Sequence, residues 1–404
     1  MNRPWTTRRL GELVSLTSGQ SPSGFRFGSS GTPYFKVEQL GKSSKYLDRD
    51  ATPYLSAKVP SVPAGSVLIA KRGAAIALNR VRILREPGFM DTNVMALTPG
   101  PEIDSEFLYY WLSHRGLGDI ADTTSVPQIN NKHIVPLAIA LPDVAEQRAI
   151  VAALRSTDDS AAAMRRLVAK RRGIRQGLLQ ALLTGRTRLH GFTAPWTPVR
   201  LGDHVRYIRN AALSRAQLDV SSPLRYLHYG DIHTRTSPLL DASAEVMPRA
   251  PRELAGTAGL LAVGDLVFAD ASEDPDGVGR SVEITGVPAD GVIPGLHTIT
   301  ARFDKRVLAD GFKAYLQNIG AFRRQLLALA AGTKVLATTR AYISGIELPL
   351  PGTDEQAAIA RVLHDADAEI GALERRLRSV RAVKQGLMQE LLTGRTRLDG
   401  ETPA

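Results

Sequence analysis

The stretch Leu-Leu-Thr-Gly-Arg-Thr-Arg-Leu at residues 182–189 decides the fold, because the same eight residues return at 391–398. Leu-Pro at 141–142 and Glu-Gln at 146–147 return in the same way, each 209 residues further along the chain. Eight consecutive identities are not a coincidence, and an internal repeat constrains an architecture more than any local pattern does. The chain of 404 residues is therefore predicted to contain two related units.

A second repeat marks where each unit begins. Trp5 and Leu10-Gly11 correspond to Trp196 and Leu201-Gly202, with an offset of 191 residues. Because the offset has grown to 209 at the later repeat, the region between is 18 residues longer in the second unit. We therefore divide the chain into alternating variable and repeated segments, with bounds at 1–140, 141–190, 191–349 and 350–404.

Each repeated segment is predicted to form one long helix. In the second copy, apolar residues recur at 4-3 spacing from Ile359 to Leu391, interrupted by Lys384. This spacing is typical of a coiled coil. A helix of about 38 residues is about 57 Å long, and it has to bury its apolar stripe to be stable. The comparable stripe is its own copy, so we predict an antiparallel helix pair within the chain. Packing on the adjacent domain or on another protein is the alternative.

The first copy departs from a clean seam and is strongly basic. It places Arg171 and Arg175 at seam positions, where we expect Leu167 and Ile174 to take over. Residues 146–190 contain ten Lys/Arg and three Asp/Glu, within a chain of net charge +11 and pI about 9.9. This excess favours an anionic partner along the helix. A solvated helix face explains it equally well.

The composition excludes several classes of protein. Hydrophobic residues make up 43% and charged residues 23% of the chain, which is typical of a folded protein. The chain has no cysteine, so disulfides and thiolate metal sites are excluded. No apolar run reaches the roughly 18 residues that a membrane span requires, and the N-terminus has no signal-peptide pattern. We therefore expect a cytoplasmic protein without membrane contact.

The two variable regions share an order of elements but not their residues. β-like runs are expected in the first region at 33–37, 67–70 and 94–97, and in the second at 225–229, 266–269 and 298–303. A helix should follow in each, at 107–113 and 312–329. The predicted fold class is therefore α+β: two mixed domains separated by an antiparallel pair of long coiled-coil helices, with a pseudo-two-fold repeat.

Polar side chains follow these predicted strands and precede the repeated segments. Their types suit base reading, since Arg and Lys recognise guanine and Asn and Gln recognise adenine in the major groove. An ordinary polar turn is the alternative for any one of them. The candidates of the first domain are Lys36, Glu38, Gln39, Lys71, Arg72, Gln128, Asn130, Asn131 and Lys132. Those of the second domain are His228, Tyr229, Asp231, His233, Arg235, Lys334, Thr338, Thr339 and Arg340.

No known catalytic motif is present in the sequence. Gly41-Lys42-Ser43 lacks the upstream glycine of a phosphate-binding loop, and the His-Glu-x-x-His and Gly-x-Ser-x-Gly patterns are missing. Residues 272–283 follow a calcium-loop pattern in part, but the first position is Ser272 and the flanks read as strands. We expect a chain that is not an enzyme and that binds no cofactor or metal itself.

These features together resemble the specificity subunit of a type I restriction-modification system. The resemblance rests on both copies of Leu-Pro, Glu-Gln and Leu-Leu-Thr-Gly, on the two domain starts at Leu10 and Leu201, and on Ser-Val-Pro-Gln-Ile at 125–129. It covers essentially the whole chain. It implies that each variable region is a target recognition domain for one half of an asymmetric, split DNA site, and that the helices set the spacing.

The resemblance also implies partners. Two DNA adenine methyltransferase subunits would dock on the helices, and restriction/translocase subunits would complete the complex on double-stranded DNA. S-adenosylmethionine, ATP and magnesium would then belong to those partners. The basic first helix would meet either DNA phosphates or the methyltransferase. The alternatives are the recognition subunit of a methylase-nuclease fusion enzyme of the type IIB kind and a stand-alone DNA-binding regulator.

Overall fold

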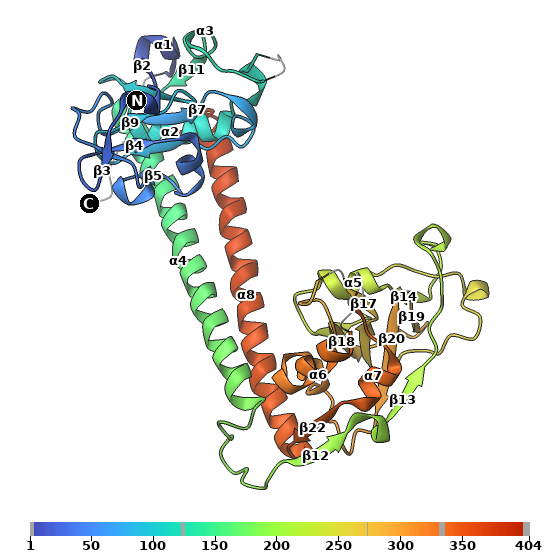
Figure 1. The fold of residues 1–404 in the computed structure, drawn as a ribbon. Helices are drawn as coiled ribbons and strands as arrows, with labels where there is room; N and C mark the ends of the chain where they lie inside the picture. The colour runs from blue at the N-terminus through green and yellow to red at the C-terminus, as the bar shows by residue number, and fades with distance from the viewer. Residues whose placement is uncertain (1–3, 123–125, 273, 331–335, 399–404) are drawn as a thin grey trace. The chain divides into compact units, whose positions relative to one another are not determined.

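The computed structural model describes residues 4–122, 126–272, 274–330 and 336–398. The chain divides into two compact units (Figure 1). The first comprises residues 1–165 and 375–404, and the second comprises residues 166–374. Each unit therefore holds one variable region together with part of both repeated segments. None of the helices in the described part of the chain is long and apolar enough to cross a membrane.

Both repeated segments are long helices, as predicted. Helix α4 spans Val144–Leu182 and helix α8 spans Thr353–Leu391, each of 39 residues. Each ends shortly before a glycine with positive φ, Gly185 at +68° and Gly394 at +71°. A glycine in the left-handed region is a common helix stop because it has no Cβ to clash.

Within each unit the beginning of one long helix packs beside the end of the other. In the first unit, Ile150 and Leu154 of α4 share a core with Leu391 of α8. In the second, Ile359 and Leu363 of α8 share a core with Leu182 of α4. The same cores contain residues of the adjacent domain, so the stripe is buried on its copy and on its own domain together. The prediction of an antiparallel pair is confirmed.

The prediction that Ile174 replaces an arginine in the seam is wrong. Its side chain is exposed, at 43%. Arg175 stays in the seam because Asp367 of α8 accepts hydrogen bonds from its guanidinium. Arg171 lies 2.9 Å from the Glu369 carboxylate. Charge pairing with the facing helix therefore keeps these arginines where apolar residues were expected.

Each domain contains a five-stranded sheet of the same topology. In the first domain the order is β2-β10-β7-β8-β5, formed by Val14–Ser18, Val94–Pro99, Val67–Ala70, Arg82–Leu84 and Tyr46–Leu47. In the second it is β13-β20-β16-β18-β15, formed by Val205–Ile208, Thr298–Phe303, Leu266–Ala269, Ser281–Gly286 and Leu239–Asp241. In both sheets the first four strands pair antiparallel and the last one pairs parallel. The two domains are thus versions of one scaffold.

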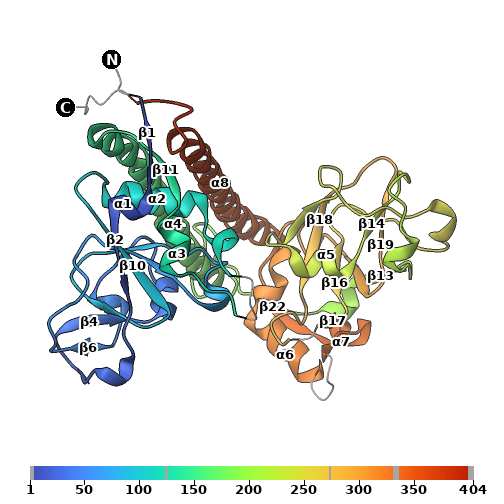
Figure 2. The same ribbon diagram turned by 90° about the horizontal axis from the view of Figure 1, so that it is seen from above.

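Several small sheets supplement the five-stranded sheet of each domain. β1 (Thr6–Arg9) pairs with β11 (Ala138–Leu141), and β12 (Thr197–Arg200) pairs with β22 (Glu347–Leu350). Each of these pairs joins the start of a domain to its end and leads into a long helix. In the first domain β3 (Phe27–Gly28), β6 (Leu55–Ser56), β4 (Thr32–Phe35) and β9 (Phe89–Met90) form a separate sheet, of which Figure 2 labels β4 and β6. In the second, β14 (Arg225–Leu227) pairs with β19 (Val292–Pro294), and β17 (Ala271–Ser272) pairs with β21 (Leu336–Ala337).

Short helices complete the domains. The first domain has α1 (Leu10–Leu13), α2 (Ser105–Arg115) and α3 (Asn131–Ile134), and the second has α5 (Tyr229–Thr234), α6 (Gly320–Ala330) and α7 (Arg340–Gly345). The single helix predicted at 312–329 is instead a 3-10 helix, Lys313–Asn318, followed by α6. Ile319 between them is extended, with ψ of 115°, and the glycine after it favours a break at this point.

Candidate nucleic-acid interface

In the first domain, the backbone brings three separate groups of predicted site residues to one place. The amide of Asp91 donates to the carbonyl of Phe35, where β4 ends, at 2.8 Å, and the amide of Lys71 donates to the carbonyl of Asn93 at 2.9 Å. The amide of Ile129 donates in turn to the carbonyl of Lys71 at 2.9 Å. The ends of β4 and β7 and the segment before α3 therefore meet around residues 91–93.

The second domain repeats this arrangement bond for bond. The amide of Gly295 donates to the carbonyl of Leu227 at 2.8 Å, and the amide of Asp270 donates to the carbonyl of His297 at 3.1 Å. The amide of Thr338 donates to the carbonyl of Asp270 at 2.6 Å. We call each of these meeting points the strand-end junction of its domain. The backbone of the junction is shared, whereas its side chains are not.

Some residues of the first domain that were predicted to contact DNA instead contact other residues of the protein. Gln39 is fully buried; its Oε1 accepts from the Lys36 amide at 2.8 Å and its Nε2 donates to Glu38 at 2.9 Å. A base could not reach this amide, so Gln39 shapes the turn after β4. Lys36 places its ammonium 3.7 Å from the centre of the Tyr54 ring, a cation–π contact that fixes its direction. Glu38 is exposed.

The remaining candidates of the first domain lie together. Arg72 forms an isolated bridge with Gln128, and Lys71 Nζ donates to Ser18 Oγ at 3.3 Å. Asn130 precedes α3 and its amide donates to His133 Nδ1 at 2.9 Å. Arg72, Asn131 and Lys132 are exposed, and Lys132 lies 3.5 Å from Asp122. Ser125 lies outside the described residues. The junction of this domain therefore leaves Arg72, Asn131 and Lys132 accessible.

In the second domain, His228 and Asp231 are the structural counterparts of Lys36 and Gln39. The His228 amide donates to Asp231 Oδ2 at 3.2 Å, and His228 Nδ1 accepts from the Gly230 amide at 3.1 Å. His228 is 7% exposed, and burial, assisted by Arg215, lowers the pKa of its imidazole. A neutral ring with an unprotonated Nδ1 is what this cap requires. His228 and Asp231 thus hold α5 in place and leave little of the imidazole accessible.

The other candidates of the second domain are partly engaged. Arg235 binds the Glu245 carboxylate through two hydrogen bonds of 2.5 and 2.6 Å. Thr338 is buried, and Thr339 Oγ1 accepts from the Tyr342 amide at 3.1 Å as the cap of α7. Arg340 is exposed and lies 5.6 Å from the Tyr207 ring centre. Lys334 lies outside the described residues.

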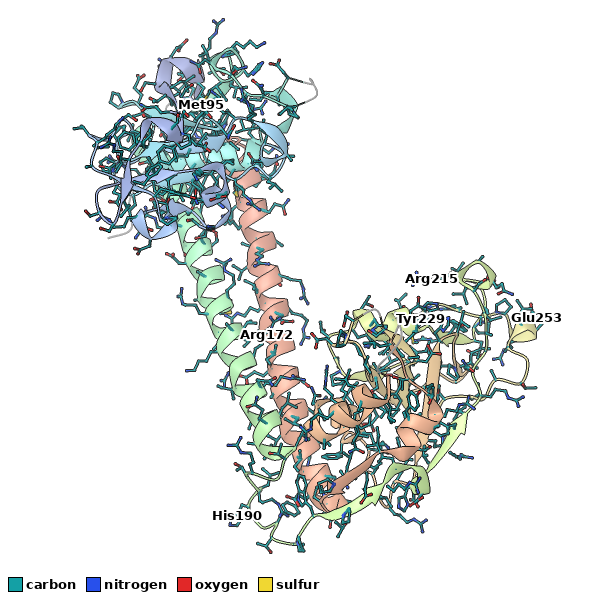
Figure 3. All side chains as sticks on the ribbon, in the orientation of Figure 1. Met95, Arg172, His190, Arg215, Tyr229 and Glu253 are labelled. Atoms are coloured by element: carbon teal, nitrogen blue, oxygen red, sulfur yellow. The ribbon has the colours of Figure 1, made fainter. Side chains whose placement is uncertain are left out.

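Tyr229 and His233 face a pocket that the sequence did not indicate. Its volume is about 580 Å³, and its lining also includes Asp274, Arg280 and His297. Tyr229, labelled in Figure 3, is the first residue of α5. His297 and Asp270, like Asn93 and Asp91 in the first domain, were missed because no motif marks a loop position. The one available signal was that residues 93 and 297 directly precede the equivalent strands β10 and β20. The described residues contain no group of His, Cys, Asp or Glu suited to a metal ion.

The repeated Glu-Gln pairs fix each long helix to its domain and to the end of the other helix. Gln147 Oε1 accepts from the Asp104 amide at 2.8 Å, and Gln356 Oε1 accepts from the Ala309 amide at 2.9 Å. Glu146 binds Arg397 through bonds of 2.6 and 2.7 Å. Glu355 binds Arg188 in the same way, at 2.5 and 2.6 Å. We call these two carboxylate–guanidinium pairs the helix-end clasps.

A second repeated contact lies further along the helices. Asp158 accepts from Lys384 Nζ at 2.6 Å and from the Tyr110 hydroxyl at 2.7 Å. Asp367, 209 residues later, accepts from Arg175 and from the Tyr315 hydroxyl at 3.0 Å. Burial and the aspartate raise the pKa of both tyrosine hydroxyls, which therefore stay protonated and keep donating. The charged seam residues thus form part of the repeat.

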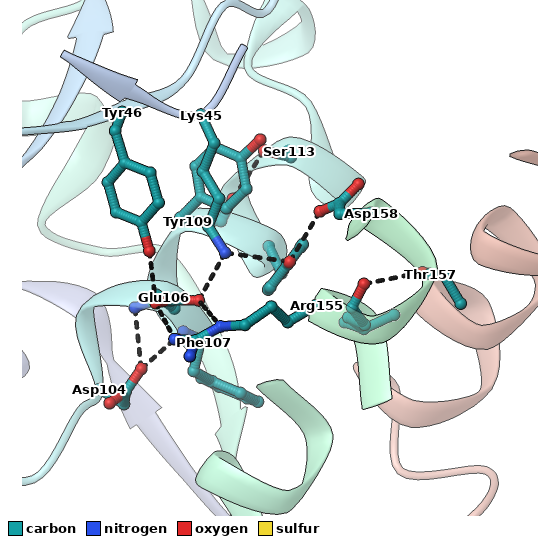
Figure 4. A network of polar contacts seen from close by, with 12 residues as sticks. Lys45, Tyr46, Asp104, Glu106, Phe107, Tyr109, Ser113, Arg155, Thr157 and Asp158 are labelled. Carbon is teal, nitrogen blue, oxygen red and sulfur yellow. Dashed lines mark hydrogen bonds and ion pairs between the residues drawn. The ribbon is translucent and has the colours of Figure 1, made fainter. Parts of the chain in front are cut away.

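Glu106 of α2 makes a contact with a long helix that has no equivalent among the described contacts of the second unit. Glu106 of α2 accepts from Lys45 at 2.5 Å, from the Tyr46 hydroxyl at 2.6 Å and from Arg155 of α4 (Figure 4). Burial by itself would raise the pKa of Glu106, but the three donors outweigh it and the pKa is lowered. At the corresponding place in the second unit, buried Glu283 accepts from the amides of Gly311 and Ala314 at 2.6 and 2.8 Å.

Comparison with known proteins supports this architecture. Residues 2–169 match the family described as the type I restriction modification DNA specificity domain. The chain is 24% identical over 202 residues to the type I restriction enzyme MjaVIII specificity subunit of Methanocaldococcus jannaschii, covering 46% of this chain and 47% of that protein. It is 22% identical over 136 residues to the putative MjaX specificity subunit of the same organism, covering 33% and 31%. The chain thus matches about half or less of the length of these curated relatives.

Two solved structures resemble the whole chain. The S subunit of a type I restriction-modification system from M. genitalium is 14% identical, with a TM-score of 0.58 and 96% of both chains covered. A structure reported for assembly and conformational transition of the type I R-M system is 17% identical, with a TM-score of 0.58 and 97% and 98% covered. These two likenesses concern the fold. By sequence, residues 2–169 match the type I restriction modification DNA specificity domain, and over its whole length the chain has the fold of these two solved structures.

Proposed function

We propose that this chain is the non-catalytic DNA-recognition subunit of a type I restriction-modification complex, and that each domain reads one half of an asymmetric, bipartite site. One observation carries the proposal: the two strand-end junctions share their backbone bonds and differ in their side chains. A constant scaffold with variable side chains is what two readers of unlike sequences require, because base contacts specify while the framework positions them.

The side chains at the two junctions support unlike half-sites. The first junction presents Lys71 and Arg72, whose donors match the N7 and O6 acceptors of guanine. In the second, Asp270 and Ala271 occupy the corresponding positions after β16. Lysine and arginine in one domain thus correspond to aspartate and alanine in the other, so the same base pair would not satisfy both domains.

The long helices would set the distance between the half-sites. The shared cores and the clasps join each domain to both helices within its unit, which supports this role. Two adenine methyltransferase subunits would dock on this framework and supply S-adenosylmethionine, and restriction/translocase subunits would use ATP and magnesium. The chain itself would contribute recognition and spacing, without a catalytic group.

Exchange of residues 1–140 for the corresponding domain of a relative tests the independence of the readers. We expect genome-wide methylation mapping, in cells carrying this gene with its neighbours, to return a bipartite site of which one half alone changes. A change in both halves, or a continuous site, would overturn the proposal.

Insertion of seven residues into the middle of both α4 and α8 tests the spacing. Seven residues preserve the seam and lengthen a helix by about 10 Å, or about three base pairs at 3.4 Å each. The methylated site should keep both half-sites and gain about three base pairs between them. Insertion in α8 alone serves as the control, because it breaks the register of the pair and should abolish methylation. An unchanged gap in the double insertion would refute a spacing role.

A further inference from the structure

His297 has an unusual backbone conformation, with φ of +58°. Among the described residues other than glycine, Asn79 alone shares a positive φ. Asn79 has a structural reason, since its Nδ2 donates to the carbonyls of Leu112 and Ser113 at 3.3 and 3.1 Å, at the end of α2. The His297 side chain, by contrast, is 51% exposed. A strained residue that points an accessible side chain outward is more typical of a binding surface than of a core.

Two neighbours fix the orientation of the His297 ring. The Tyr229 ring lies 5.4 Å away and nearly perpendicular, at 83°. His297 Nδ1 lies 3.2 Å from Asp270 Oδ1. Tyr229 is in turn held between His228, at 4.4 Å, and His233, at 6.2 Å. The imidazole is thus positioned at the pocket it lines with Tyr229 and His233.

The location of His297 is equivalent to that of Asn93 in the first domain. The carbonyl of each accepts from the first residue after the central strand, Asp270 for His297 and Lys71 for Asn93. Each also directly precedes the next strand of the sheet, β20 or β10. Both domains therefore place a side chain capable of base reading at the centre of the junction, although the residue type differs.

The nearby carboxylate determines what the imidazole can offer. Asp270 Oδ1 is buried and makes no hydrogen bond among the described residues, but its negative charge lies 3.2 Å from His297 Nδ1. A negative charge there repels a lone pair on Nδ1 and attracts a proton, so Asp270 favours the tautomer with its proton on Nδ1. Nε2 then carries a free lone pair and acts as an acceptor. In the major groove the matching donors are the exocyclic amino groups of adenine and cytosine, whereas guanine presents acceptors.

We infer that His297 is a specificity-determining residue of the second domain, which presents Nε2 to an amino group of adenine or cytosine and is positioned by Asp270 and Tyr229. This inference rests on the proposed DNA-recognition function. It adds to that function a residue that accepts a hydrogen bond from a base. In the first domain, by contrast, Lys71 and Arg72 would donate hydrogen bonds to a base.

Selection from a duplex DNA library with randomised half-sites tests the inference, using the full-length chain within the complex purified from its host. His297→Gly removes the imidazole and suits the positive φ, so it should fold at least as well as the native chain. We expect it to lose about tenfold in preference at one A·T or C·G position of the second half-site, in line with a typical single-base effect. The first half-site should be unchanged.

Two further variants complete the experiment. His297→Gln retains an acceptor and a donor and should favour adenine at that position. His190→Gly is a matched control, because this exposed histidine is the last residue of the first repeated segment and lies outside both variable regions, and its selected site should equal the native one. Selection of the native sequence in both halves by His297→Gly and His297→Gln would overturn the inference while leaving the proposed function intact. A native complex that selects no sequence at all would overturn both.

Discussion

The two ends of the helix pair are nearly identical, while the two strand-end junctions differ in almost every side chain. Glu146 with Arg397 and Glu355 with Arg188 are the same clasp in the two units, and each guanidinium also lies beside a tryptophan, Trp5 at 5.6 Å or Trp196 at 5.8 Å. At the junctions the corresponding pairs are lysine and aspartate, asparagine and histidine. The repeat therefore preserves how domain and helix are joined and leaves free what the domain presents.

One detail distinguishes the clasps. The indole Nε1 of Trp5 donates to Glu146 Oε2 at 3.1 Å, whereas that of Trp196 is buried and has no hydrogen-bond partner in the described part of the chain. An unpaired buried donor costs stability. The first clasp should therefore be the more stable one. Comparing the stability lost on removal of each clasp tests whether the two ends of the helix pair are equivalent.

Removal of the clasp carboxylates should have the largest effect. Glu146→Ala and Glu355→Ala each remove the carboxylate that binds a clasp arginine, and each of these glutamates is 3% exposed. We expect calorimetry of the full chain to show the unfolding midpoint of the affected unit lowered by roughly 10 °C, as for a broken buried ion pair. The loss should be greater for Glu146→Ala, because Trp5 also loses its acceptor.

Glu86→Ala is the matched control for these variants. Glu86 binds Arg49 in an ion pair at the surface, with a guanidinium that is 60% exposed. Surface pairs contribute little, so the midpoint should fall by about 2 °C or less. If Glu86→Ala lowered the unfolding midpoint as much as the clasp variants do, the clasps would not be important for the stability of their units.

Glu106 should produce an intermediate effect that is confined to the first unit. Glu106→Gln keeps an acceptor but removes the charge that Lys45, Tyr46 and Arg155 bind, and we expect the midpoint of this unit to fall by roughly 5–8 °C. The second unit should be unaffected, since Lys45, Tyr46 and Arg155 all belong to the first unit. Hydrogen exchange measured at α2 and α7 would assign the loss to one unit.

The same residue gives the first unit a pH dependence. The pKa of Glu106 is lowered in the folded chain, so the unfolded chain binds more protons as the pH falls. Its contribution is therefore complete above the ordinary carboxyl pKa of about 4.5 and is lost as the pH falls through the folded value. The first unit should lose stability faster below pH 4.5 in the native chain than in Glu106→Gln. Parallel pH profiles of the two proteins would contradict this assignment.

The long helices could be predicted from the sequence because the repeat contains the same pattern twice. The 4-3 spacing around Ile359 and Leu363 predicted the α8 seam, and its match to the first copy predicted the antiparallel pair. The charged seam positions were misjudged at Ile174, since a helical pattern does not reveal that Asp367 faces Arg175. A pairing between residues 192 positions apart is visible only once both helices are placed.

The candidate site was predictable in its location more than in its residues. The predicted site residues were placed at strand ends and in the segment before each long helix, and the backbone brings these segments together. Gln39 and His228 were chosen by residue type, yet their neighbours use them as caps. His297 and Asp270 were not predicted, because they lie in two loops that are far apart in the sequence. Only the folded structure shows that these loops are in contact. Whether any of these side chains contacts a base stays a prediction.

The smallest expected effect concerns the inner charged pairs, and it sharpens the comparison most. Lys384 and Arg175 occupy equivalent positions, 209 residues apart, and both bind an aspartate that also accepts from a tyrosine. Arg175 donates to Asp367 through Nε and Nη2, whereas Lys384 offers one ammonium to Asp158. Arg175→Lys should therefore lose one charge-assisted hydrogen bond and lower the midpoint of the second unit by about 2–4 °C, while Lys384→Arg should change the first unit by about 1 °C or less. Calorimetry of the two single variants and of the double variant measures the unfolding midpoint of each unit. If Lys384→Arg destabilised its unit as much as Arg175→Lys does, each pair would be adapted to its own cation, and the repeat would preserve charge without preserving geometry.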